Sequence, residues 1–112
     1  MKIAFPVNKD EGLNSVIASH FGRAKAFIIY DSESKQTVTI PITKHQENKC
    51  IPVKILEGFD LDAIYVFGLG WRALNLLEEK NIKAKTGSFT TVQEVVGHLD
   101  DLEDLETTCG GH

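Results

Sequence analysis

The chain has 112 residues, of which 42% are hydrophobic, and this is enough apolar material for one hydrophobic core and too little for two. The net charge is −4 and is unevenly distributed, because all 12 Lys and Arg residues lie before residue 86 and the segment after it carries six acids and no base. The absence of a basic stripe argues against a nucleic-acid partner, since that affinity depends on clustered Lys and Arg.

The first half of the chain predicts three strands and a helix. Residues 3–7 form a short apolar run, and a long polar loop follows over 8–22. Residues 26–31 are rich in aromatic and β-branched side chains, and a polar turn connects them to a partner strand over 37–42. A helix is expected over 52–58, because it begins with Pro and ends with Gly.

The second half predicts two strands and two helices. Residues 63–67 are an unbroken apolar run, as expected for a central strand buried on both faces. An apolar stripe predicts a helix over 71–80, and a short strand over 82–85 is expected near the sheet edge. The last helix starts where Thr91 and Glu94 match a capping box. Its expected buried face consists of Val92, Val95, Val96 and Leu99.

The chain ends in an acidic segment followed by Thr-Thr-Cys-Gly-Gly-His. Such a composition is typical of a flexible terminus. We therefore expect a single α/β domain over 1–106 and a flexible tail carrying Cys and His over 107–112.

No stretch reaches the roughly 18 apolar residues that a membrane-spanning helix needs, and the first residues enter a strand pattern without the layout of a signal peptide. Two cysteines are too few for a disulfide framework, so free thiols or metal ligands are expected. These features predict a cytoplasmic protein with no membrane partner.

The order of the elements predicts a mixed sheet with helices on its faces. If the first three strands are antiparallel neighbours, the third runs parallel to the first. Right-handed crossovers then place the fourth and fifth strands parallel to it as well. The expected order is 3-2-1-4-5. Four carboxyl strand ends share one edge of this sheet, and open α/β sheets bind ligands at that edge.

Several residues with metal-binding or ligand-binding chemistry are expected at this edge. His20, His45 and Cys50 lie in loops predicted there, and imidazole and thiolate suit iron, zinc or copper better than magnesium or calcium. Arg23 would neutralise an anionic ligand, and Trp71 would cover a cofactor. Each residue also has a simpler interpretation: a surface histidine, a buried thiol, an arginine paired with an acid, or a packing tryptophan.

Two further motifs leave alternatives open. The sequence Gly68-Leu69-Gly70-Trp71-Arg72-Ala73 fits the loose pattern G-x-G-x-x-A, but no acidic residue follows about 20 positions later to bind a ribose. The pattern therefore argues against a nucleotide ligand, whereas binding of an anion at the helix N-terminus remains an alternative. Cys109 and His112 either chelate a metal or belong to an unstructured end. No G-x-S-x-G motif appears and no clustered carboxylates lie at predicted strand ends, so the sequence gives no positive signal for an enzyme.

Four segments carry a family resemblance: Met1-Lys2-Ile3-Ala4-Phe5-Pro6-Val7, Ser19-His20-Phe21-Gly22-Arg23-Ala24 with Phe27, Gly68-x-Gly70-x-x-Ala73-x-x-Leu76-Leu77, and Asn81-Ile82-Lys83. Together they resemble the dinitrogenase iron-molybdenum cofactor biosynthesis family, which includes NifX, NifY and the C-terminal domain of NifB. The resemblance implies a ribonuclease-H-like three-layer α/β/α sandwich with a five-stranded mixed sheet. It also implies non-covalent carriage of an iron-sulfur or iron-molybdenum precursor cluster, without nuclease activity.

By position, His20 matches the loop histidine of the family, and His45 matches a histidine that often follows the third strand. A cysteine at the position of Cys50 is less regular in the family. The tails of family members vary, so the resemblance assigns no role to the tail of this chain. Three hypotheses follow: a cluster carrier whose partners are cluster donor or acceptor proteins, an anion or small-molecule-binding regulatory module using the Gly68-Leu69-Gly70 turn, and, from fold analogy alone, a hydrolase. The sequence specifies neither the cluster nor the oligomeric state.

Overall fold

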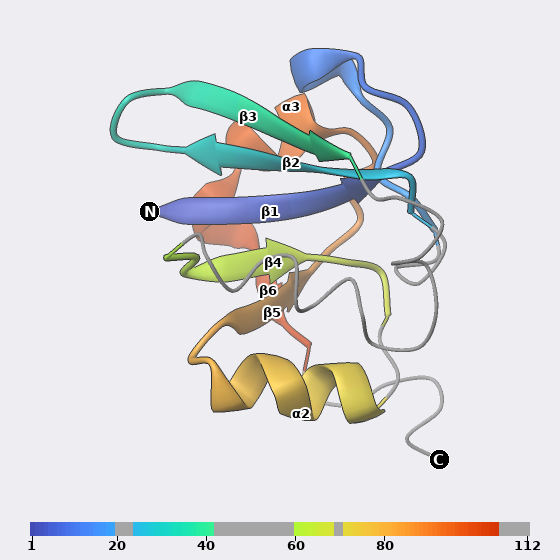
Figure 1. The fold of residues 1–112 in the computed structure, drawn as a ribbon. Coiled ribbons are helices and arrows are strands. Elements are labelled where there is room, and N and C mark those ends of the chain that lie inside the picture. Colours follow the sequence, from blue (N-terminus) through green and yellow to red (C-terminus); the bar gives the residue numbers. More distant parts are fainter. Residues whose placement is uncertain (20–23, 42–59, 69–70, 106–112) are drawn as a thin grey trace.

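A computed structural model of the protein describes residues 1–19, 24–41, 60–68 and 71–105, without the side chains of residues 71–73. Six strands form one mixed sheet (Figure 1). In chain order the strands are β1 (Lys2–Val7), β2 (Ala26–Asp31), β3 (Gln36–Pro41), β4 (Ala63–Tyr65), β5 (Lys83–Thr86) and β6 (Glu103–Asp104). Their order across the sheet is β3-β2-β1-β4-β5-β6.

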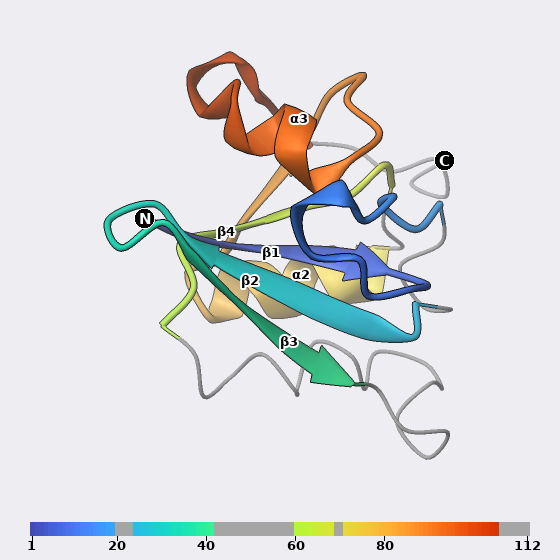
Figure 2. The same cartoon turned by 90° about the horizontal axis from the view of Figure 1, so that it is seen from above.

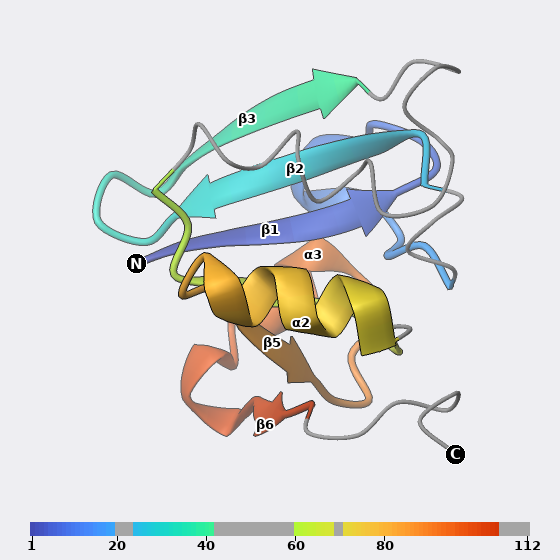
Figure 3. The ribbon, with the colours of Figure 1, turned by 60° about the horizontal axis from the view of Figure 1, so that its bottom comes forward.

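Within the described residues, two α-helices lie on opposite faces of the sheet (Figure 2). The helix α2 (Trp71–Glu79) lies in front of the sheet in Figure 3, between β1 and β5, and α3 (Val92–Val96) lies on the other face. Each face has its own apolar core, because successive side chains of a strand point to opposite sides. The core under α2 includes Ala4, Phe27, Ile29, Ile64, Leu77 and Ala84, and the core under α3 includes Ile3, Phe5, Ile28, Tyr65, Val92 and Val95.

The predicted strand order 3-2-1-4-5 is confirmed, and a sixth strand extends it. The strand β2 is antiparallel to β1 and β3, whereas β4 is parallel to β1 and β5 is parallel to β4. The prediction of five strands was wrong. After α3 the chain returns and pairs β6 antiparallel with β5, where Lys85 lies opposite Asp104 and forms an ion pair with it. The strand β5 is therefore an inner strand and not an edge strand.

The helix α2 ends close to its predicted end, whereas α3 ends before its own. The helix α2 closes at Asn81, which adopts a positive φ of 60°, and the amide of Ile82 donates to the carbonyl of Leu77 at 2.9 Å. This left-handed closure turns the chain into β5. The helix α3 ends at Val96, earlier than predicted, and Leu99 packs against the core from a separate 3-10 turn at Leu99–Asp101.

The helix predicted over 52–58 lies outside the described residues. Within the described ranges, no helix combines the length and the apolar character that crossing a membrane requires.

Candidate functional site

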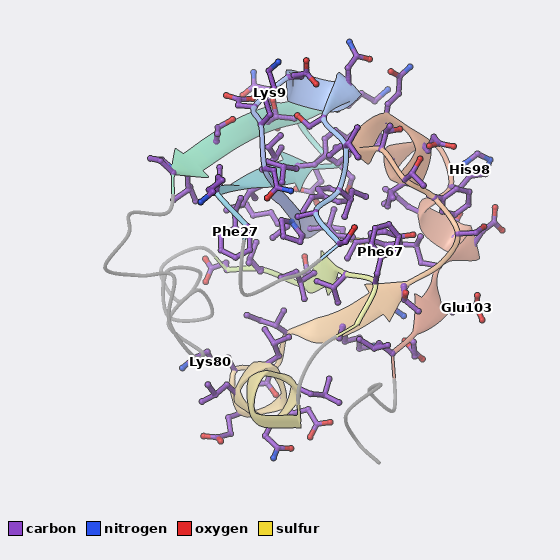
Figure 4. The ribbon with its side chains drawn as sticks, turned by 90° about the vertical axis from the view of Figure 1, so that its right-hand side faces the viewer. Lys9, Phe27, Phe67, Lys80, His98 and Glu103 are labelled. Carbon is purple, nitrogen blue, oxygen red and sulfur yellow. The ribbon has the colours of Figure 1, made fainter. Side chains whose placement is uncertain are left out.

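The four parallel strands β1, β3, β4 and β5 end at the same side of the sheet, which faces the viewer in Figure 4. We call this side the carboxyl edge. It consists of the strand ends Val7, Pro41, Tyr65 and Thr86 and of the described residues that follow Val7, Tyr65 and Thr86. Ligands bind at such an edge in open α/β sheets because loops and helix N-termini converge there.

The loop after β1 is described as far as Ser19 and is attached to the rest of the edge. It contains a 3-10 turn at Gly12–Asn14, and the fully buried hydroxyl of Ser15 accepts a hydrogen bond of 2.7 Å from the Glu11 amide. The amide of Ile17 donates to the Thr90 carbonyl at 2.9 Å, and the amide of Ala18 donates to the Pro6 carbonyl at 2.7 Å. The loop is therefore held between β1 and the start of α3.

The turn after β5 is attached to β4 through a buried tyrosine. The hydroxyl of Tyr65 donates to the Phe89 carbonyl at 2.9 Å and accepts from the Phe89 amide at 3.1 Å. Burial raises the pKa of this hydroxyl above its usual value. Both backbone groups of Phe89 are thereby bound to the end of β4.

An exposed aromatic side chain lies beside this tyrosine. Phe67 follows β4 and is 37% exposed, with its ring edge-on to Tyr65 at a centroid distance of 5.8 Å. It lies at the carboxyl edge in Figure 4. The sequence predicted a strand through residue 67, but β4 ends at Tyr65. An apolar run does not reveal which of its residues reaches the surface, so the sequence missed Phe67 as an edge residue.

Most of the predicted site lies outside the described residues, namely His20, Arg23, His45, Cys50, Gly70, Cys109 and His112. Gly68 is described and is partly exposed, with open space where a Cβ would lie. Trp71 is the first residue of α2, and its side chain lies outside the description. The structure therefore places Gly68 shortly after β4 and the backbone of Trp71 at the start of α2, and the other positions stay predictions.

The described residues contain no group of three or more His, Cys, Asp or Glu side chains that could hold a metal ion. The histidine among them, His98, has a structural role. Its Nδ1 lies 2.9 Å from the Glu94 carbonyl, and its ring stacks on Phe89 at 4.7 Å. His98 therefore contacts the end of α3, and it is not one of the predicted metal donors.

The chain resembles known proteins along nearly all of its length, although no curated protein matches it. It is similar to a NifB-like protein from Thermotoga, with 25% identity, a TM-score of 0.77, and coverage of 95% of this chain and 94% of that one. It shares its fold with the apo form of the orange protein from Desulfovibrio gigas, at 19% identity and a TM-score of 0.80, covering 94% of this chain and 92% of that one. The sequence profile described as dinitrogenase iron-molybdenum cofactor matches residues 1–101. The chain therefore belongs to the dinitrogenase iron-molybdenum cofactor family.

Proposed function

We propose that the protein is a non-catalytic carrier whose cargo is an iron-sulfur or iron-molybdenum-type cluster, or a precursor of one. The observation that carries this proposal is the family match over residues 1–101. The likeness to a NifB-like protein over nearly the full length of both chains supports it. The partners of such a carrier are proteins that donate or accept the cluster in the cytoplasm.

The cargo would bind at the carboxyl edge. His20 and His45 lie in the segments that follow β1 and β3, and Cys50 lies further along the second of these. Imidazole and thiolate are the donor types that suit iron. Arg23 would offset the negative charge of a cluster. The half-exposed ring of Phe67 offers an apolar surface at the same edge.

The turn that begins at Gly68 and includes Gly70 would let the backbone approach the cargo, and Trp71 would cover it. Cys109 and His112 would act as donors that arrive late and close over the site. We propose that the fold is ribonuclease-H-like and serves only as a scaffold, because a fold shared with an enzyme does not bring that enzyme's activity.

The proposal is tested by anaerobic loading with ferrous iron and sulfide, followed by measurement of absorbance and of iron retained per chain. The double variant His20→Ala/Cys50→Ser should retain about one tenth of the iron of the wild type, because loss of metal contacts commonly costs tenfold or more. The control His98→Gln removes an imidazole outside the predicted donor set and keeps a donor within reach of the Glu94 carbonyl. Equal retention by the double variant and the control would remove His20 and Cys50 from the site.

A regulatory module that binds anions is the second candidate. The Gly68-Leu69-Gly70 segment precedes α2 in the sequence, and the first turn of this helix contains no acidic residue that would oppose an anion. Calorimetric titration with inorganic phosphate separates the two candidates. Phosphate binding in a chain that retains no iron after loading would favour the module over the carrier.

A further inference from the structure

We propose that the hydroxyl group of Tyr65 is a positioning group for the carboxyl edge. It fixes the turn after β5 and, through that turn, the loop that leads from β1 to His20. The consequence for cargo binding rests on the proposed function, whereas the coupling between the turn and the loop does not.

The tyrosine is held rigidly where it meets the turn. It belongs to β4, which pairs with β1 on one side and with β5 on the other. Its ring is fully buried and lies between Phe5, at a centroid distance of 6.2 Å, and Phe67, at 5.8 Å. A phenylalanine would fill the same space. The hydroxyl group therefore serves a purpose beyond packing, and its two hydrogen bonds to Phe89 identify that purpose.

The residues next to Phe89 hold the loop after β1. The carbonyl of Thr90 accepts from the Ile17 amide at 2.9 Å, and Thr91 forms an isolated antiparallel bridge with Val16. The amide of Val92 donates to the Ser15 carbonyl at 3.0 Å. A shift of Phe89 would move the acceptor of Ile17, which is only one residue away. The position of the turn therefore sets the position of the loop.

The loop leads directly to a predicted metal donor. Ala18 is hydrogen-bonded to the end of β1, and His20 follows two residues later. Two residues of extended chain span at most about 7 Å. The anchor at Ala18 and the bonds around Ile17 thus fix the chain two residues before His20. Small displacements of a donor weaken metal binding, because the supporting contacts of a site orient its ligands.

The test compares Tyr65→Phe with the control Tyr30→Phe. Tyr30 is also nearly fully buried under α3, but it pairs with Ile3 at the opposite end of β1. In the absence of metal, amide hydrogen exchange at Phe89 and Ile17 should be about tenfold faster in Tyr65→Phe than in the control, because the variant loses both hydrogen bonds between the hydroxyl group and Phe89. Amides of β2 report global opening and should exchange equally in both variants.

The second measurement uses chains loaded anaerobically with ferrous iron and sulfide. The rate at which a chelator removes iron should rise about tenfold in Tyr65→Phe and stay unchanged in Tyr30→Phe. A purely structural role would change global stability without this difference.

Each outcome decides a separate statement. Unchanged exchange at Ile17 in Tyr65→Phe would overturn the coupling between turn and loop. Faster exchange with unchanged iron release would overturn the role of Tyr65 in positioning the site. A wild-type chain that retains no iron would overturn the proposed function, and the exchange data would then decide the coupling alone.

Discussion

Gly87 lies so close to the Tyr65 hydroxyl that a larger residue would disturb its hydrogen bonds. A Cβ at position 87 would lie 3.3 Å from Tyr65 Oη and 3.5 Å from Phe89 Cδ2. Replacing Gly by Ala restricts the unfolded chain, which favours folding by about 0.4–1 kcal/mol. Overpacking opposes folding by about 1–3 kcal/mol. We therefore expect Gly87→Ala to lower the free energy of unfolding by roughly 1 kcal/mol, as measured in urea.

A double-mutant cycle assigns this cost to the hydroxyl group. In a Tyr65→Phe background the nearest atom is absent, so Gly87→Ala should cost less there, with a coupling of at least about 0.5 kcal/mol. The control Gly97→Ala places its Cβ 3.6 Å from backbone oxygens, an ordinary contact, and should show no coupling. The same cost for Gly87→Ala in both backgrounds would contradict the close-approach explanation.

At the scale of elements, α3 has only five residues and depends on its N-terminal cap. The Glu94 carboxylate accepts hydrogen bonds from the hydroxyl and amide groups of Thr90 and Thr91. These bonds, led by that from the Thr90 hydroxyl, hold the pKa of Glu94 below its usual value of 4.5. The stabilisation is therefore complete above about pH 4.5 and is lost as the pH falls through the lower folded-state pKa.

We expect Glu94→Gln to reduce the pH dependence of stability on the acid side. The urea midpoint of the wild type should fall between pH 4.5 and the lower folded-state pKa, and the variant should show a shallower fall. Some slope should remain, because hydrogen bonds from the Glu33 backbone and the Lys85 side chain lower the pKa values of Asp31 and Asp104. Identical slopes in the two proteins would remove Glu94 from the acid response.

The sequence predicts those elements whose signals are local. The capping box at Thr91 and the hairpin of β2 and β3 depend on residues within a few positions, and both are present. The strand β6 has no such signal, because its sequence is Glu-Asp and acidic residues are rare in strands. It forms because β5 offers Lys85 as a partner and because Leu105 packs against the core under α2. This information exists only in the folded molecule.

At the scale of the whole molecule, the rules for connecting strands restrict topology strongly, so the strand order and the carboxyl edge followed from the order of the elements. The Tyr65–Phe89 contact could not be predicted from the sequence. It joins residues 24 positions apart, and nothing in the apolar run around Tyr65 indicates which group its hydroxyl contacts. The predicted donors His20, His45 and Cys50 lie outside the described residues, so their meeting at one ligand remains a prediction.

The domain boundary at residue 106 remains a prediction, and the contacts of Leu105 allow a test of it. The Leu105 amide donates to the Ala84 carbonyl at 2.9 Å, and the Leu105 side chain packs against the core under α2. A chain that ends at residue 102 lacks both interactions and should lose about 2 kcal/mol of unfolding free energy. A chain that ends at residue 106 keeps them and should match the full chain within about 0.5 kcal/mol.

Urea unfolding of these two truncated chains checks the boundary, and iron loading of the longer one checks the tail. A stability loss in the chain that ends at residue 106 would place residues 107–112 inside the domain. If Cys109 and His112 arrive late and close over the cargo, the chain without them should release iron to a chelator faster than the full chain, since each lost ligand weakens metal binding. If the two chains release iron to the chelator at equal rates and transfer the cluster to a partner at equal rates, the tail has no role in binding.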